Sequence, residues 1–296
     1  MKTEITKIQR FSTHDGDGVR TTVFFRGCPL RCKWCHNPET LTDAPPFYFS
    51  EESCIECTAC ADVCPASAHI FGEKHTVDRE KCTECLKCTE ICPTGAIEKC
   101  ALTLDTEKIM ETVLLDRIFY GKDGGITLSG GEPMAQPEAA IALLANAKDA
   151  SITTAMETSG VWQKKYVSQL SKICDLFLWD IKDGNEKRLR ENTGANLSQI
   201  LENLYAADNL GCVTELRCIM IKGVNMDTES FSAIAEIYKK LRHCRGIKLL
   251  PFHPYGSSKY TRLGMEYAYG KECIPTNADL KNAKRFFREH GVIVIE

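Results

Sequence analysis

The chain has 296 residues, of which 43% are apolar and 26% are charged, and its formal net charge is −3. These fractions are typical of a globular enzyme, and the charge argues against a nucleic-acid-binding surface. No run reaches the roughly 18 apolar residues of a membrane span, so no membrane partner is expected. The 17 cysteines are unusual. They cluster in a long chain without an apolar leader, which predicts a cytoplasmic protein whose thiols stay reduced.

The first predicted strand, residues 21–25, leads directly into three closely spaced cysteines. Cys28, Cys32 and Cys35 form a C-x3-C-x2-C pattern with no fourth cysteine close behind. A cuboidal 4Fe-4S cluster has four irons, so three thiolates would leave one iron open to another ligand. A three-cysteine zinc site completed by His36 is the alternative at this spacing.

A repeated cysteine block follows. The segments CIECTACADVCP, from Cys54, and CTECLKCTEICP, from Cys82, superimpose with a constant offset of 28 residues. Each reads C-x2-C-x2-C-x3-C-P, the bacterial ferredoxin pattern, in which the fourth cysteine of one block ligates the cluster of the other. We therefore predict two 4Fe-4S clusters in this segment, with a pair of structural zinc sites as the alternative. One cluster would be held by Cys54, Cys57, Cys60 and Cys92, and the other by Cys82, Cys85, Cys88 and Cys64.

From about residue 102 onward, apolar strand-like runs alternate with amphipathic stretches. Residues 231–241 have the apolar spacing of a helix, behind Thr228 as its predicted cap. Regular alternation of strands and helices implies parallel strands with right-handed crossovers, and hence an α/β fold built as a full or partial barrel. The predicted strands are residues 124–128, 152–156, 176–181, 214–221, 247–252 and 292–295.

Charged residues stand near the C-terminal ends of these strands, where parallel strands buried on both faces should be apolar. The two-residue period of a strand places Asp180 and Lys182 on one face, and Glu215 and Arg217 on one face of the next strand. His253 ends the strand after that. We interpret this convergence as a functional site at the barrel mouth, while internal ion pairs within each couple remain the alternative.

The motifs resemble those of the radical S-adenosylmethionine (SAM) superfamily. The C-x3-C-x2-C pattern with Trp34 before its last cysteine is similar to the cluster motif of that superfamily, and LSGGEP at 128–133 is similar to its GGEP motif. More narrowly, DGDGVRTTVFFRGCPLRCKWCHNPE at 15–39 resembles the signature of the glycyl radical enzyme activating enzymes, of which the pyruvate formate-lyase activating enzyme is one. A double ferredoxin insert is typical of one branch of that family. The segments METSG, WDIK, LRCIMI and LLPFHPYG follow in family order, so the resemblance covers nearly the whole chain.

The resemblance implies a partial (β/α)6 barrel of the TIM type at residues 1–46 and 102–296, with an inserted ferredoxin-like α+β domain at 47–101. It implies three 4Fe-4S clusters, S-adenosyl-L-methionine and room for a monovalent cation. The catalytic cluster would be bound by Cys28, Cys32 and Cys35.

The resemblance also implies the positions that surround S-adenosylmethionine and the substrate. Trp34 would lie by the adenine, and Asp15 would lie where the substrate loop enters. Glu157 departs from the pattern, because the pyruvate formate-lyase activating enzyme has Asp there, one methylene shorter. The methionyl end would meet Gly130, Gly131 and Glu132, and the carboxylate, ribose and substrate peptide would be surrounded by Glu157, Asp180, Lys182, Arg217 and His253.

The implied activity is that of an anaerobic oxidoreductase. It would cleave S-adenosylmethionine reductively and use the 5′-deoxyadenosyl radical to abstract hydrogen from a glycine Cα of a partner glycyl radical enzyme. A flavodoxin- or ferredoxin-type protein would supply the electron. Two alternatives remain: a radical SAM enzyme that acts on a small molecule, and an iron-sulfur electron-transfer protein.

Overall fold

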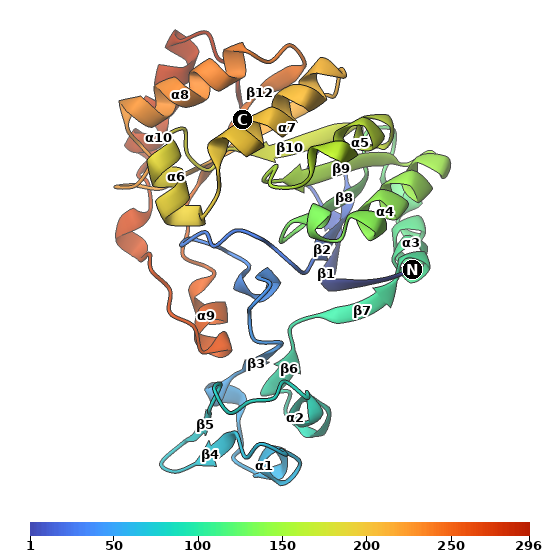
Figure 1. Cartoon of the computed structure of the whole chain (residues 1–296), viewed down its shortest axis with the longest axis vertical. Coiled ribbons are helices and arrows are strands. Elements are labelled where there is room, and N and C mark those ends of the chain that lie inside the picture. The colour runs from blue at the N-terminus through green and yellow to red at the C-terminus, as the bar shows by residue number, and fades with distance from the viewer.

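The computed structural model describes residues 1–296 as a large sheet surrounded by helices, from which a small unit projects (Figure 1). The sheet has nine strands in the order β13-β12-β11-β10-β9-β8-β2-β1-β7. Neighbours from β2 to β13 are parallel, whereas β1 is antiparallel to both β2 and β7. The strands are β1 (Lys2–Ser12), β2 (Arg20–Phe25), β7 (Leu102–Asp105), β8 (Gly125–Gly130), β9 (Thr153–Thr158), β10 (Leu176–Asp180), β11 (Thr214–Met220), β12 (Cys244–Pro251) and β13 (Val294–Ile295).

The predicted α/β class with a mostly parallel sheet is confirmed, and every predicted strand corresponds to an observed one. The sequence did not predict the antiparallel strands β1 and β7. Their residues are largely polar or exposed, and β-strand preference depends on packing context more than on residue type. Pairing with the hydrophobic strand β2, as in Ile5 opposite Phe25, makes β1 a strand.

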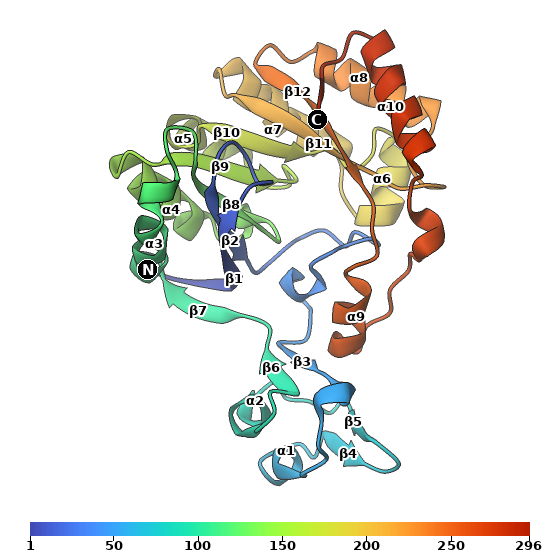
Figure 2. The same ribbon diagram turned by 180° about the vertical axis from the view of Figure 1, so that it is seen from behind.

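Helices surround the large sheet in both views (Figures 1 and 2). Successive side chains of β10 point to opposite faces of the sheet, as predicted. Phe177 and Trp179 belong to the main core that the helices share. Leu178 packs with Ala155 and Leu176 in a separate cluster. The helices are α3 (Thr106–Leu115), α4 (Pro137–Asp149), α5 (Val167–Ile173), α6 (Glu186–Thr193), α7 (Leu197–Asn209), α8 (Thr228–Lys239), α9 (Ser257–Leu263) and α10 (Asn277–Glu289), and the short 3-10 turns are Pro38–Thr40, Glu51–Ser53, Arg117–Phe119, Pro133–Ala135, Lys164–Tyr166 and Lys271–Cys273. None of the helices combines the length and apolar character needed to cross a bilayer.

The predicted helix at 231–241 is α8, but its cap is not Thr228. Asp227 is the N-cap, and its carboxylate accepts a hydrogen bond from the amide of Ser230 at 2.8 Å. The same carboxylate pairs with Arg188 at 2.7 Å, a contact from another helix that the local sequence does not reveal.

The small unit contains two short two-stranded sheets and two short helices. Its core is formed by Phe47, Cys60, Cys88 and Ile97, so half of its buried core residues are cysteines. Such a small apolar core suits a unit that is stabilised by bound metal. Its elements are β3 (Phe47–Phe49) paired with β6 (Ile97–Lys99), β4 (His69–Phe71) paired with β5 (His75–Val77), α1 (Ala59–Asp62) and α2 (Lys87–Ile91).

Helix α9 joins the small unit to the large sheet, and it lies beside β3 in both views (Figures 1 and 2). The Arg79 guanidinium stacks on the Phe47 ring at 4.1 Å and donates a hydrogen bond to the carbonyl of Arg262 at 3.2 Å. Arg262 in turn lies over the Tyr48 ring at 4.5 Å and pairs with Glu98. Two stacked arginines therefore fix how the small unit sits against α9.

Candidate active site

Residues 27–35, here called the triad loop, follow β2 and carry Cys28, Cys32 and Cys35. The loop is held by its backbone. The amides of Arg31 and Lys33 donate to the carbonyls of Thr193 and Asn192 at 2.8 and 3.0 Å, at the end of α6. Three thiols are thereby presented from a loop whose path is set by a neighbouring helix.

The three thiols of the triad loop are free and close enough to influence one another. The pKa of Cys28 and of Cys32 is raised to about 12, chiefly by burial, with negative charge on Cys35 acting in the same direction. The Lys182 ammonium acts in the opposite direction on all three thiols. Without metal these thiols hold their protons at neutral pH, so a metal must displace protons to bind. Three free thiols beside one ammonium fit a 4Fe-4S cluster with one iron that lacks a protein ligand.

The glycine turn after β8 packs tightly against the triad loop. The amides of Gly131 and Glu132 donate to the carbonyls of Phe25 and Gly27 at 2.9 and 2.8 Å. A Cβ on Gly131 would lie 2.3 Å from the carbonyl oxygen of Gly27. At Gly130 a Cβ would lie 2.5 Å from the amide nitrogen of Phe25, and φ is +104°. Only glycine fits at either position.

Glu132 is buried beneath this turn. Its carboxylate accepts hydrogen bonds from the Thr158 hydroxyl at 2.9 Å, and from the amide and hydroxyl of Ser159 at 2.8 and 2.7 Å. Burial raises the pKa of Glu132, while these donors oppose the rise. The carboxylate thus ties the glycine turn to the end of β9. A contact of Glu132 with a methionyl group stays a prediction.

Asp180 and Lys182 form an ion pair of 3.0 Å at the end of β10, with both side chains about 20% exposed. Burial is the largest single influence on the pKa of Lys182 and lowers it, but Asp180 together with the thiols of Cys32 and Cys28 raises it by more, so the ammonium keeps its proton. Lys182 is therefore a permanent cation beside the triad thiols. The internal ion pair predicted as an alternative for these two residues is present, and it leaves part of each side chain accessible.

Arg217 pairs with Glu157 from β9 rather than with Glu215, at 3.1 Å between Nη1 and Oε1. The predicted Glu215–Arg217 pair is therefore not formed. Strand β10 lies between β9 and β11, so the long Arg217 side chain spans it to reach Glu157. Glu157 also accepts a hydrogen bond from the Ser129 hydroxyl, and burial raises its pKa while Arg217 opposes the rise.

Asp15 lies in the turn that joins β1 to β2, and its side chain reaches the middle of β2. Its carboxylate accepts hydrogen bonds from Ser12 at 2.7 Å and from Thr22 at 2.8 Å, and its carbonyl accepts one from Thr127 at 2.7 Å. The buried Arg20 guanidinium donates to the same Thr127 hydroxyl at 2.6 Å. The turn is thus anchored to β2 and β8 by side chains.

His253 and Trp34 lie where β12 and the triad loop approach each other. The ring of His253 meets the ring of His36 edge-on at 4.8 Å and stacks on Tyr255 at 4.2 Å, and its buried Nδ1 has no hydrogen-bond partner. Trp34 is only 4% exposed and packs with Phe252. Since the indole is covered by protein, its contact with an adenine stays a prediction.

The eight cysteines of the repeated blocks gather in the two predicted sets. Cys54, Cys57, Cys60 and Cys92 line one cavity, which we call the first site. The thiols of Cys82, Cys85 and Cys64 are the neighbours whose charge acts on Cys88, and these four form the second site. Each site therefore takes three thiols from one block and the fourth from the other, a donor set that fits a 4Fe-4S cluster.

The two blocks also share a backbone conformation. Glu56 and Glu84 have φ of 54° and 56°, although neither is glycine. Their amides point at sulfur, with 3.4 Å from Glu56 to Cys54 Sγ and 3.4 Å from Glu84 to Cys82 Sγ. Backbone strain of this kind persists where surrounding interactions require it. Here it turns an N–H toward a ligand sulfur at equivalent places of both sites.

Sequence reasoning missed the hydroxyl residues that hold the acidic groups. Ser129 stands beside the glycine turn and binds Glu157, whereas Thr158 and Ser159 bind Glu132. Their place inside the LSGGEP and METSG segments was the available signal. His75 lies against the thiols of the first site and had no motif to mark it.

Comparison with known proteins agrees with this geometry. The sequence pattern of the radical SAM superfamily matches residues 22–233. The chain is 37% identical over 299 residues to the choline trimethylamine-lyase activating enzyme of Oleidesulfovibrio alaskensis, with 98% of this chain and 96% of that protein covered. It is 39% identical over 288 residues to the trans-4-hydroxy-L-proline dehydratase activating enzyme of Clostridioides difficile, with 96% and 95% covered.

Among solved structures, Streptococcus suis SuiB bound to precursor peptide SuiA is similar in fold. Its TM-score is 0.53 at 11% identity, over 90% of this chain and 45% of that one. At this identity the likeness concerns the fold alone.

Proposed function

Because the chain belongs to the radical SAM superfamily, and within it to the activating enzymes of glycyl radical enzymes, we propose that it installs a radical on a glycine Cα of a partner protein. It is an enzyme of this class, and the class uses a 4Fe-4S cluster and S-adenosylmethionine. The observation that carries the proposal is the triad of free thiols beside Lys182, next to a turn where only glycine fits.

We infer that Cys28, Cys32 and Cys35 hold the catalytic cluster. When bound, the cluster and S-adenosylmethionine supply the electron transfer and the 5′-deoxyadenosyl radical that takes a hydrogen atom from glycine. The rest is positioning by the chain's own side chains. Gly130 and Gly131 let the turn pack directly on the end of β2 and on the triad loop, and Glu132 holds that turn in place. The backbone of this turn would meet the methionyl end.

The charged side chains at the strand ends would orient S-adenosylmethionine. Lys182 carries a permanent positive charge and is partly accessible, so it is suited to the methionyl carboxylate or the ribose hydroxyls. Asp180 keeps that ammonium in place. The Glu157–Arg217 pair would border the same space, with room for a monovalent cation, and His253 would face the substrate peptide.

The architecture that goes with this proposal is a partial (β/α)6 barrel of residues 1–46 and 102–296 with a ferredoxin-like insert at 47–101. The insert would hold two further 4Fe-4S clusters, three in all, and accept electrons from a flavodoxin- or ferredoxin-type protein. The grouping of its eight thiols into two sets of four supports this reading.

The test is to mix the reconstituted protein with candidate glycyl radical enzymes, S-adenosylmethionine and a reductant without oxygen. We expect an organic radical whose EPR doublet, split by the remaining Cα hydrogen, collapses when the partner carries Cα-deuterated glycine. If no partner acquires the signal while a small molecule is consumed in proportion to the 5′-deoxyadenosine formed, the small-molecule alternative is right. If protein with reduced clusters cleaves no S-adenosylmethionine at all, the proposed activity is wrong and the electron-transfer alternative is favoured.

A further inference from the structure

The first and second sites are alike in backbone but differ in their side-chain neighbours. Three polar side-chain contacts reach a ligand sulfur, and all are at the first site. His75 contacts Cys54 and Cys60 at 3.3 and 3.8 Å, and Thr94 contacts Cys92 at 3.8 Å. No side-chain donor contacts the sulfurs of the second site. The internal repeat therefore does not produce two equivalent sites.

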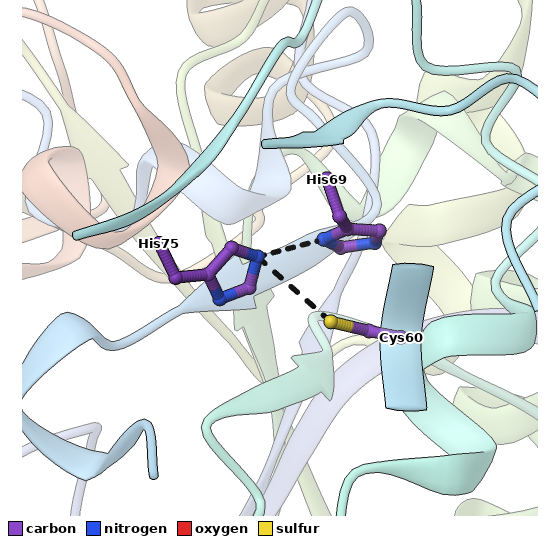
Figure 3. Close-up of side chains that lie close together, drawn as sticks. All are labelled: Cys60, His69 and His75. Atoms are coloured by element: carbon purple, nitrogen blue, oxygen red, sulfur yellow. Dashed lines mark hydrogen bonds between the residues drawn. The ribbon is translucent and has the colours of Figure 1, made fainter. Parts of the chain in front are cut away.

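His75 is fixed in place beside the sulfurs. It is 1% exposed, it stacks on Phe71 at 4.3 Å with an interplanar angle of 8°, and Phe49 meets its ring edge-on at 4.5 Å. Its Nε2 lies 3.0 Å from Nδ1 of His69, which is also buried (Figure 3). Neither ring has to move to reach its partner.

The hydrogen-bond roles follow from the chemistry of the ligand. A thiolate sulfur that binds iron only accepts hydrogen bonds, so Nδ1 of His75 must carry the proton that points at Cys54. A neutral imidazole has one N–H, so Nε2 of His75 is an acceptor, and its 3.8 Å approach to the Cys60 sulfur is a contact without a hydrogen bond. The proton between the two rings then belongs to Nδ1 of His69. The result is a series of two hydrogen bonds, in which His69 donates to His75 and His75 donates to the Cys54 sulfur.

A mononuclear metal at this place is the competing interpretation, since ligand atoms of Cys60, His69 and His75 all lie within 4.8 Å of one another. The contacts of His75 and Cys60 with the four-thiol set disfavour it. Cys60 lines the cavity together with Cys54, Cys57 and Cys92. The other nitrogen of His75 faces Cys54 rather than solvent.

We propose that His75, oriented by His69, donates a hydrogen bond to the Cys54 thiolate and thereby raises the reduction potential of the cluster at the first site. This inference rests on the proposed function, because it needs a cluster at that site. A hydrogen bond to sulfur stabilises the more electron-rich, reduced cluster, and it is strong in a buried place. The two clusters of the insert are then unequal, and the imidazole sets part of the difference.

The test is an EPR-monitored redox titration of the reconstituted full chain at one pH, comparing wild type with His75→Phe. Phenylalanine keeps an aromatic ring against Phe71 but has no N–H. We expect the potential of one insert cluster to fall, while the other insert cluster and the catalytic cluster do not shift. His69→Phe should lower the same reduction potential by a smaller amount, since His69 only orients His75 and does not contact a sulfur. His290→Phe is the matched control, because His290 also stacks on a phenylalanine, Phe286, at 4.0 Å, yet lies outside the insert.

Iron counts separate failure of this inference from failure of the proposed clusters. If wild-type insert holds no iron, or holds zinc, the cluster assignment itself is wrong. If His75→Phe keeps all its iron and no potential moves, the hydrogen-bond proposal is wrong while the clusters stand. Loss of about four irons in His75→Phe would make the imidazole a ligand or a packing element and would also overturn the proposal.

A second measurement leaves both His69 and His75 in place. The Cys28→Ala protein, labelled with 15N-histidine, should show a weak nitrogen coupling to a reduced insert cluster by pulsed EPR. Absence of that coupling, with about eight irons bound, would overturn the hydrogen bond directly.

Discussion

At the scale of single residues, the Asp180–Lys182 pair holds an ammonium beside three thiols. The Asp180 carboxylate and the nearby Cys32 and Cys28 thiols together raise the pKa of Lys182 against the effect of burial. The partial exposure of both side chains leaves the cation able to meet an anionic ligand. A buried pair that served stability alone would be closed to ligands. The pair is therefore suited to bind the carboxylate of a small molecule.

Lys182→Ala should weaken the binding of S-adenosylmethionine about ten- to a hundredfold, since it removes a charge-assisted hydrogen bond of roughly 1.5–3 kcal/mol. Anaerobic calorimetry on reconstituted protein measures the change. Lys164→Ala is the control, because Lys164 forms an exposed pair with Glu202 at 2.8 Å. Lower stability of Lys182→Ala with unchanged binding would show that the pair is only structural.

The second prediction at this scale concerns Gly131. Gly131→Ala would place a Cβ 2.3 Å from the carbonyl oxygen of Gly27, so the glycine turn and the triad loop must separate. We expect a lower thermal midpoint and loss of 5′-deoxyadenosine formation. Gly72→Ala is the matched control, since a Cβ there meets nothing within 4 Å and should leave both measurements unchanged. An active, equally stable Gly131→Ala protein would contradict the packing described for this turn.

At the scale of elements, the N-terminus of α8 shows how tertiary contacts decide which residue caps a helix. Asp227 accepts the Ser230 amide and also pairs with Arg188 of α6, whereas Thr228 is exposed. Either residue type is a good cap by itself. The ion pair to a second helix favours Asp227.

Asp227→Ala should lower the free energy of unfolding by about 1 kcal/mol or more, because it removes the cap and leaves Arg188 with one acidic partner fewer. Asp227→Asn keeps the cap and should lose less. Thr228→Ala should be nearly neutral. Thermal unfolding of the three variants measures the order, and a Thr228→Ala protein that is the least stable of them would restore the cap predicted from sequence.

At the scale of the whole molecule, the chain combines a large α/β sheet with a unit whose core is half cysteine. The two are joined through α9 and a pair of stacked arginines. The small unit has a core of only four buried residues, so we expect it to depend on bound metal for stability, whereas the large sheet has an extensive apolar core of its own. Loss of metal should therefore affect the two parts differently.

Anaerobically reconstituted protein should hold about twelve irons, from three cubane clusters. Cys28→Ala should retain roughly eight and lose cleavage of S-adenosylmethionine, whereas Cys57→Ala should lose about four and still bind it. Iron analysis together with EPR of each variant distinguishes these results. Stoichiometric zinc in protein purified without oxygen would exclude the cluster assignment.

The sequence by itself determined the parallel strands and the grouping of the cysteines. The apolar run at residues 292–295 and the alternating run at residues 176–181 are short-range strand signals, and the cysteine spacing is that of cluster ligands whatever the surrounding fold. Family motifs then located the triad loop and the glycine turn. These features are local, so they can be read along the chain.

Only the tertiary structure decided which charges meet. Arg217 of β11 pairs with Glu157 of β9, beyond β10, instead of with Glu215 on its own strand. Glu132 is held by Thr158 and Ser159 at the end of β9. β1 is a strand because it pairs with the edge of β2. His75 contacts the sulfur of Cys54 because the β4–β5 hairpin packs against the first cysteine block. Each of these contacts joins residues far apart along the chain or on different strands, and short-range patterns carry no information about such distances.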